Sequence, residues 1–173
     1  MSWAGSVRRE VFAGSPRGGW VLGHNRYRFQ ARWTLEAPPD RVYSVLERAE
    51  EYPRWWPQVR GVVMGGADGG RGRIRSVLPF ELRVTAWVMR RDPAARVLEI
   101  GLSGDIEGWA RWTVRPCGDG AVALFAQEVE ARRRLLRLLA IPGRPFFVVN
   151  HTLMMRAGQR GLRAALRRGL DEG

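Results

Sequence analysis

The sequence contains no lysine, one cysteine and two histidines, and these shortages exclude several kinds of site. Cys117 has no second cysteine with which to form an intramolecular disulfide, and a cysteine-rich zinc site is excluded for the same reason. His24, His151 and Cys117 are too few for a histidine-based metal centre. We therefore expect no metal site of that kind and no cofactor, although carboxylate sites stay open.

Long apolar runs are also missing from the chain. The apolar stretches are short and interrupted by arginine, which excludes a transmembrane helix. The N-terminal region holds no continuous apolar segment, so we expect no secretory signal, and the single cysteine fits a reducing cytoplasm. The 173 residues, 45% hydrophobic and 27% charged, have the size and composition of one globular domain.

Without lysine, all 29 basic residues are arginine, and against 17 acids they give a net charge of +12. The absence of lysine is typical of a GC-rich coding bias, so part of this arginine content need not serve a function. From Arg132 onward, ten arginines face two acids, a net charge of +8. This end of the chain is either a solvated surface or an attractor of an anionic membrane, a nucleic acid or an acidic partner. Nucleic-acid binding has only charge in its favour, because the signatures of helix-turn-helix, zinc-finger and similar modules are absent.

The first part of the chain divides into an arm and the start of a domain. Residues 1–25 are rich in glycine, serine and arginine without a sustained period, which predicts an N-terminal arm or tail before a ligand-binding domain at residues 26–173. Residues 27–36 alternate between apolar and polar side chains, as a half-buried strand does. Two prolines then open a helix at residues 39–50, and a helical turn follows at residues 52–57.

The remainder of the domain predicts a run of strands and one long helix. Glycine, proline and aspartate turns separate the strands, which favours an antiparallel meander. The helix begins near Pro145 and ends near Leu170. We expect the strands at residues 59–65, 72–78, 81–91, 96–102, 107–115 and 121–131.

Two stretches near the start and one near the end carry a family resemblance. Residues 33–43 read Trp-Thr-Leu-Glu-Ala-Pro-Pro-Asp-Arg-Val-Tyr, and residues 52–57 read Tyr-Pro-Arg-Trp-Trp-Pro. The ending includes Asn150, His151, Met154, Met155, Arg156, Gly158, Gly161, Leu162 and Leu166. With the element order, these residues resemble the START-like (SRPBCC) superfamily, in particular its actinobacterial polyketide cyclase/dehydrase-like members, over about residues 27–170.

The resemblance implies an α+β helix-grip fold. In that fold a curved seven-stranded antiparallel sheet wraps around a long C-terminal helix, with two short helices after the first strand. The space between sheet and helix is a cavity for an apolar or aromatic small molecule. The superfamily contains many non-enzymatic members and no universal catalytic motif, so the resemblance leaves the function open.

The long C-terminal helix has two distinct faces at 100° per residue. One face gathers the arginines Arg156, Arg160, Arg163 and Arg167. The opposite face carries Phe147, His151 and Met154, with Asn150 at its flank. His151 is one of very few polar groups there, so it either contacts a ligand, by hydrogen bonding or as an acid or base, or is a core histidine satisfied by a strand group or water.

Aromatic side chains supply the second signal for a site. Trp33, Trp56 and Trp112 occupy strands or the helical turn, where they either stack on a flat ligand or pack in the core. In the last two strands we expect Trp112 and Gln127 to face inward. The candidate ligand-binding residues are therefore Trp33, Trp56, Trp112, Gln127, Phe147, Asn150, His151 and Met154.

The basic apolar segment at residues 132–139 is the last candidate. Its arginines and leucines make it amphipathic, so it either meets an anionic membrane, closes the cavity as a lid or covers the surface. The preferred interpretation of the chain is a binder or carrier of a hydrophobic small molecule, such as a lipid or an aromatic polyketide-like compound. The alternatives are a polyketide cyclase/dehydratase-type enzyme that uses His151 as acid or base, and a basic module for membranes or nucleic acid.

Overall fold

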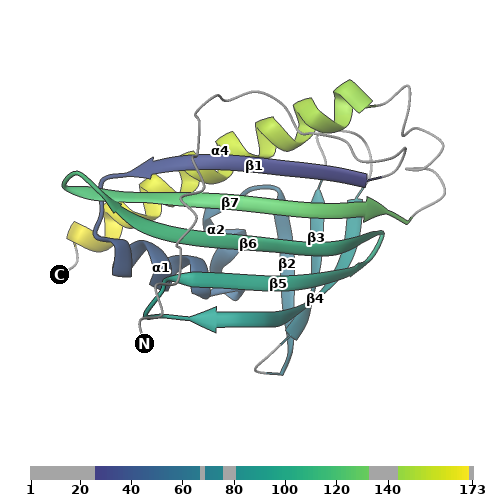
Figure 1. The fold of residues 1–173 in the computed structure, drawn as a ribbon, viewed down its shortest axis with the longest axis horizontal. Helices are drawn as coiled ribbons and strands as arrows, with labels where there is room; N and C mark the ends of the chain where they lie inside the picture. The colour runs from purple at the N-terminus through teal and green to yellow at the C-terminus, as the bar shows by residue number, and fades with distance from the viewer. Residues whose placement is uncertain (1–25, 67–68, 76–80, 133–143, 172–173) are drawn as a thin grey trace, which may run out of the picture.

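Seven antiparallel strands form one curved sheet in the order β1-β7-β6-β5-β4-β3-β2, as the computed structural model shows (Figure 1). The structure describes residues 26–66, 69–75, 81–132 and 144–171. The strands are β1 (Arg26–Leu35), β2 (Val59–Gly66), β3 (Gly69–Arg75), β4 (Glu81–Asp92), β5 (Val97–Gly104), β6 (Ile106–Cys117) and β7 (Gly120–Ala131). The α+β helix-grip fold expected from the sequence is thereby confirmed, while residues 1–25 lie outside the described part of the chain.

The sheet is an open meander to which β1 is added by a pairing between residues distant in sequence. Strands β2 to β7 pair with their neighbours in sequence, as the turn signals predicted. β1 adds to β7 rather than to β2, and the pairing runs from Arg26 opposite Glu130 to Leu35 opposite Ala121. The first strand of the domain and the last are therefore adjacent at the same edge of the sheet.

The strand bounds differ from the sequence prediction mainly in the β2–β3 hairpin. There β3 begins at Gly69, where a turn was expected, and Gly66 and Gly69 are already paired. The absence of side chains lets β3 approach both neighbouring strands, because a Cβ at Gly69 would lie 2.9 Å from the carbonyl oxygen of Ala86 on β4. A Cβ at Gly70 would lie 2.7 Å from the carbonyl oxygen of Val63.

Two short helices follow β1, in line with the prediction. α1 (Pro39–Glu47) has a proline at its first position and buries Val42, Tyr43 and Leu46 on one face. It ends three residues earlier than expected, and a 3₁₀ turn, η1 (Ala49–Glu51), leads into α2 (Tyr52–Trp55). Helices α1 and α2 pack on the sheet, α1 against β6 and β7 and α2 against β2.

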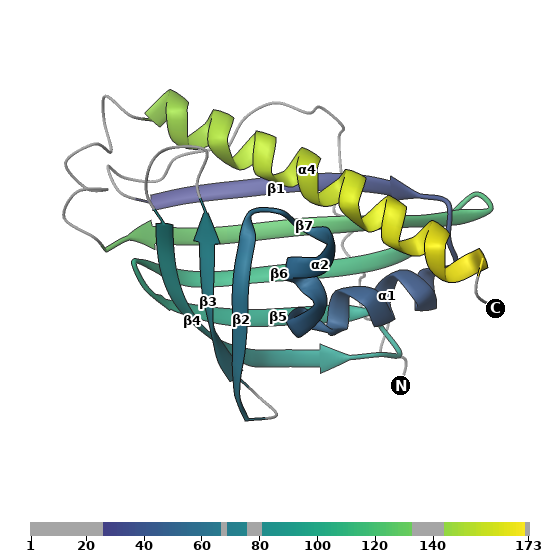
Figure 2. The ribbon, with the colours of Figure 1, turned by 180° about the vertical axis from the view of Figure 1, so that it is seen from behind.

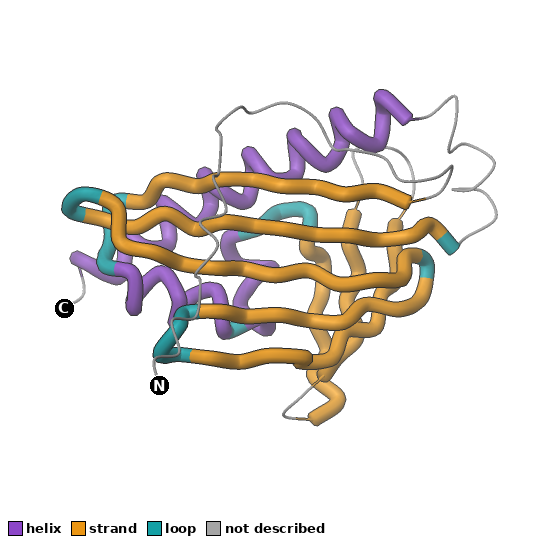
Figure 3. The backbone as a smooth tube through the Cα atoms, in the orientation of Figure 1, coloured by secondary structure: helices purple, strands orange, loops and turns teal. Residues whose placement is uncertain are grey.

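The long C-terminal helix α4 (Arg144–Asp171) crosses the same face of the sheet (Figures 2 and 3). Its C-terminal half lies beside α1 and α2, whereas no other helix accompanies its N-terminal half in either view. Among the described helices, three thus cover one half of the concave face and α4 covers the other half. No helix of the described residues is long and apolar enough to cross a membrane.

Candidate ligand-binding cavity

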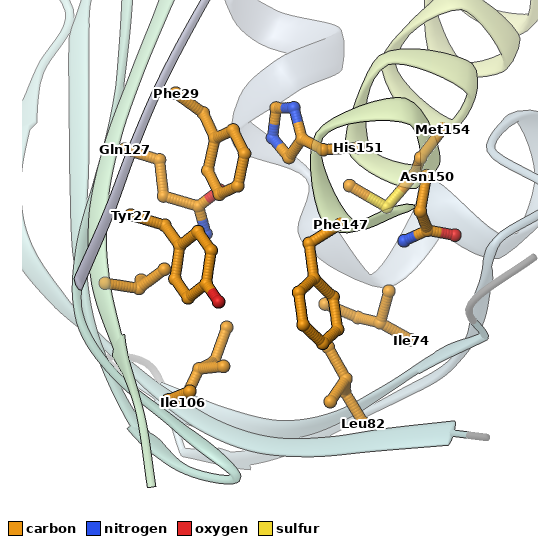
Figure 4. Close-up of a pocket in the computed structure, with 12 residues that line it drawn as sticks. Tyr27, Phe29, Ile74, Leu82, Ile106, Gln127, Phe147, Asn150, His151 and Met154 are labelled. Atoms are coloured by element: carbon orange, nitrogen blue, oxygen red, sulfur yellow. The ribbon is translucent and has the colours of Figure 1, made fainter. Parts of the chain in front are cut away.

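A cavity of about 100 Å³ lies between the sheet and the N-terminal half of α4 (Figure 4). Strands β1 and β7 form one wall, and the N-terminal half of α4 forms the wall opposite. The residues that line it are Tyr27, Phe29, Ile74, Leu82, Ile106, Gln127, Val129, Ala131, Phe147, Asn150, His151 and Met154.

The lining follows from the period of each element. In β1 and β7, alternate residues face the cavity, and Phe29 is opposite Gln127 while Tyr27 is opposite Val129. On α4 the inward residues Phe147, His151 and Met154 recur at helical spacing. Ile74 and Leu82 are the apolar inward positions of β3 and β4, which are otherwise rich in arginine.

His151 is the buried polar group of this cavity. Its side chain is only 9% exposed, and its imidazole stacks on the ring of Phe29 with centroids 3.8 Å apart and planes 10° from parallel. The ring of Phe125 also packs near this imidazole, with the two ring centroids 6.0 Å apart. Burial lowers the pKa of His151 from 6.5 to about 4, because the surrounding side chains cannot solvate an imidazolium. The ring is therefore neutral at physiological pH.

The Nε2 atom of His151 is buried and has no hydrogen-bond partner among the described residues. A buried polar atom without a partner costs about 1–3 kcal/mol, so most such atoms in proteins are paired. The cavity offers the place where a partner could lie, since His151 borders it. The remaining polar groups of the lining are Gln127, Asn150 and the hydroxyl of Tyr27, which Figure 4 shows around the same space.

The structure brings five of the eight candidate site residues together. Gln127, Phe147, Asn150, His151 and Met154 all line the cavity. Their role in ligand binding stays a prediction. Their shared position agrees with the helix face and with the inward register of β7 that the sequence predicted.

The three candidate tryptophans lie elsewhere, in the core and not in the lining of this cavity. Trp33 packs against Trp112 and Trp56, with ring centroids 4.6 and 5.6 Å apart, and all three are buried in the core. They face inward, as predicted, but under the half of the sheet that α1 and α2 cover. Position along the strand, which alternation does not specify, therefore decides between core and cavity.

Two glycines of α4 explain why the helices pack so closely there. A Cβ at Gly158 would lie 2.6 Å from the indole of Trp56, and one at Gly161 would overlap the carbonyl oxygen of Trp55. The close approach at these glycines is therefore to α2 and the residue that follows it. The indole of Trp56 also donates a hydrogen bond to the carbonyl oxygen of Met154, at 3.0 Å. α2 thereby positions the stretch of α4 that carries His151.

Tyr27 and Phe29 are cavity residues that the candidate set missed, although their alternation with arginines placed them on the inward side. Ile106, Val129 and Ala131 also follow the inward register of β6 and β7. Ile74 carried little signal, because it is the single large apolar residue of β3, and Leu82 is another lining residue that the candidate set missed. The basic segment at residues 132–139 lies outside the described residues except for Arg132, which forms a salt bridge with Glu107.

Solved structures with this fold come from several bacteria. The Zhui aromatase/cyclase from Streptomyces sp. R1128 is 16% identical with a TM-score of 0.69, covering 84% of this chain and 96% of its own. A START superfamily protein from Mycobacterium smegmatis is 16% identical with a TM-score of 0.66, covering 82% and 97%. The protein TTHA0849 from Thermus thermophilus is 19% identical with a TM-score of 0.64, covering 80% and 98%. Structural similarity at sequence identities this low establishes a shared fold alone.

Sequence comparison is more specific than these structural similarities. No curated protein matches the chain significantly. The family described as polyketide cyclase/dehydrase and lipid transport, however, matches residues 26–171, which span every described helix and strand. The chain therefore belongs to the polyketide cyclase/dehydrase and lipid transport family.

Proposed function

We propose that the protein binds and carries a hydrophobic small molecule, a lipid or an aromatic polyketide-like compound, in the cavity between the sheet and α4. The observation that carries this proposal is the buried His151, whose side chain lines an otherwise mostly apolar cavity and whose Nε2 has no hydrogen-bond partner among the described residues. Small-molecule sites commonly combine an apolar lining with a few convergent polar groups.

The neutral imidazole defines the kind of ligand that fits best. Either tautomer of His151 leaves Nε2 able to make one hydrogen bond, as a donor or as an acceptor. A ligand hydroxyl or carbonyl at this position removes the cost of the unpaired atom, while the rest of the ligand contacts phenyl and aliphatic groups. We therefore expect an apolar ligand with one hydrogen-bonding group directed at His151.

The volume limits what the cavity holds in this conformation. An engineered apolar cavity of about 150 Å³ takes up benzene, so a space of about 100 Å³ suits the end of an acyl chain, and a whole ring enters it only when side chains shift. A larger ligand needs side chains to move. Met154 is the most adaptable of the lining residues, because its side chain is unbranched and has three rotatable bonds.

A cyclase/dehydratase-type enzyme is the second candidate. Membership of the family, the fold shared with an aromatase/cyclase and a histidine in the cavity support it. The low pKa of His151 counts against it, because general acid–base catalysis is most efficient with a pKa near the working pH. Binding is therefore the primary proposal, and catalysis would require a bound substrate that raises the pKa of this histidine.

Native mass spectrometry of the purified protein tests the proposal. We expect a co-purified or added apolar compound to remain bound to the wild type and to be displaced in a variant whose cavity is filled, Ala131→Phe. A catalytic role predicts in addition that His151→Phe abolishes turnover of a polyketide substrate but retains binding. If neither protein retains any apolar compound, the binding proposal is wrong.

A further inference from the structure

Large apolar side chains are strongly exposed at a second place, remote from the cavity. Four of the six such residues in the described part of the chain lie on β2 and β4: Val63 is 70%, Met64 42%, Trp87 44% and Met89 55% exposed. In Figures 1 and 2 the ends of β2 and β3 that meet at the hairpin turn project beyond the rest of the sheet. An exposed apolar group of this kind marks an interaction site more often than an accident of packing.

Two of these exposed residues, Val63 and Trp87, share one face of the sheet with a set of arginines. Val63 is opposite Arg71 in the β2–β3 pairing, and Arg73 is opposite Arg83 in the β3–β4 pairing. Cross-strand partners lie on the same side of a sheet, and the intervening residues Ile74 and Leu82 face the cavity. Val63, Arg71, Arg73, Arg83 and Trp87 therefore point away from the cavity, and we call them the β2–β4 outer surface.

The arginines of the β2–β4 outer surface differ from others on the same face of the sheet. Arg28 forms a salt bridge with Glu128, and Arg111 forms one with Glu99. In contrast, the described residues provide no carboxylate to the guanidinium groups of Arg71, Arg73 or Arg83. Like charges directly opposite each other in a sheet are destabilising, so the Arg73–Arg83 pair favours an external anion between or above them.

Trp87 gives this surface an amphipathic aromatic group. Its indole covers the backbone of Gly101 on β5, where a Cβ would overlap its ring atoms. The ring is thus held flat on the sheet while almost half of the side chain stays exposed. Tryptophans with one apolar side and one polar edge are enriched at the boundary between lipid and water.

We propose that the β2–β4 outer surface docks on an anionic phospholipid membrane. The three arginines bind lipid phosphates and headgroups, Val63 at the hairpin enters the apolar boundary, and Trp87 lies at the level of the headgroups. A nucleic acid would satisfy the arginines equally well, but it offers nothing to the aliphatic side chains exposed at the end of the hairpin. The apolar component of the surface therefore favours a lipid partner.

Vesicle binding with charge-matched variants tests this proposal. The probe is phosphatidylcholine vesicles containing phosphatidylserine, compared with phosphatidylcholine alone, and binding is measured by co-sedimentation. Each basic residue near an anionic membrane raises the binding affinity roughly fivefold. The triple variant in which Gln replaces Arg71, Arg73 and Arg83 should therefore bind on the order of a hundredfold more weakly. The matched control replaces Arg32, Arg115 and Arg156 with Gln, which are also exposed and unpaired in the described structure.

A second variant separates lipid contact from charge alone. Val63→Asn combined with Trp87→Gln retains the net charge and should weaken binding about tenfold, because apolar burial is lost. Melting temperatures near that of the wild type establish that all variants are folded. The proposal is overturned if the wild type does not bind anionic vesicles, if the control arginines matter as much as the surface arginines, or if the surface variants lose binding to a single-stranded oligonucleotide but not to vesicles.

Discussion

The imidazole of His151 on α4 lies face to face with the phenyl ring of Phe29 on β1, with ring centroids 3.8 Å apart. This stack joins the long helix to the edge of the sheet and buries the histidine in its neutral form. Nε2 of this imidazole is buried and has no hydrogen-bond partner among the described residues. His151 is therefore the group of the cavity lining whose hydrogen bonding is left incomplete within the described structure.

The burial of His151 predicts a loss of stability in mild acid. Above pH 6.5 the imidazole is neutral in both the folded and the unfolded chain, so the free energy of unfolding has its full value. As the pH falls from 6.5 toward 4, the unfolded chain takes up a proton that the folded chain refuses. Stability should decline by about 3 kcal/mol over this range on account of this residue.

Denaturant unfolding of the wild type and of His151→Phe at a series of pH values measures this effect. Titration of all other groups is common to both proteins, so the difference between the two free energies isolates His151. We expect the difference to change with pH between 6.5 and 4 and to be constant above pH 6.5. Parallel curves for the two proteins would contradict the neutral, desolvated state of the imidazole.

The contact between α4 and α2 predicts an unusually sensitive glycine. In Gly161→Ala the new Cβ meets the carbonyl oxygen of Trp55, which is backbone and cannot rotate away, so the helices must separate. We expect the free energy of unfolding to fall by about 3 kcal/mol or more. Gly65→Ala is the control, because the nearest atom to its Cβ would be 3.8 Å away, and it should change stability by only about 0.5 kcal/mol. Equal effects in the two variants would refute the proposed close packing.

The separation between cavity and core predicts opposite effects of two substitutions. Ala131→Phe should fill the cavity and abolish binding of a small apolar probe, while stability changes by about 1 kcal/mol or less. Trp33→Phe should retain binding but lower stability by about 2 kcal/mol, because Trp33 packs between Trp56 and Trp112 in the core. Calorimetric titration and thermal unfolding of both variants check this. If Trp33→Phe loses binding without losing stability, the tryptophans belong to the ligand site and the separation of cavity from core is wrong.

The sequence was most informative about the order and faces of the elements. Alternation in residues 27–36 and the turn residues between strands depend on local chemistry, and they specify strands well. The pairing of β1 with β7 is not local, and no sequence pattern specified it; the resemblance to a known superfamily implied only a curved seven-stranded antiparallel sheet around the long helix. The β2–β3 hairpin was placed imprecisely, because glycines that usually make turns here allow two backbones to approach.

The candidate site was predictable where one helix face was enough to define it. Phe147, His151 and Met154 followed from helical spacing, and Gln127 followed from the inward register of β7. Trp33 and Trp112 face the same side as the cavity, but they lie under α1 and α2. Where those helices cover the sheet depends on the contact of Gly158 and Gly161 with α2, a long-range relationship that no local pattern carries.

The preference of the cavity for a polar ligand over its apolar isostere tests the central claim most directly. Phenol and toluene have nearly the same shape, and only phenol can hydrogen-bond to Nε2 of His151. We expect the wild type to bind phenol about tenfold more tightly than toluene, and His151→Phe to bind both equally, as measured by ligand-detected NMR titration at neutral pH. If neither compound binds, or if the preference for phenol persists in His151→Phe, His151 is not the polar centre of a ligand-binding cavity.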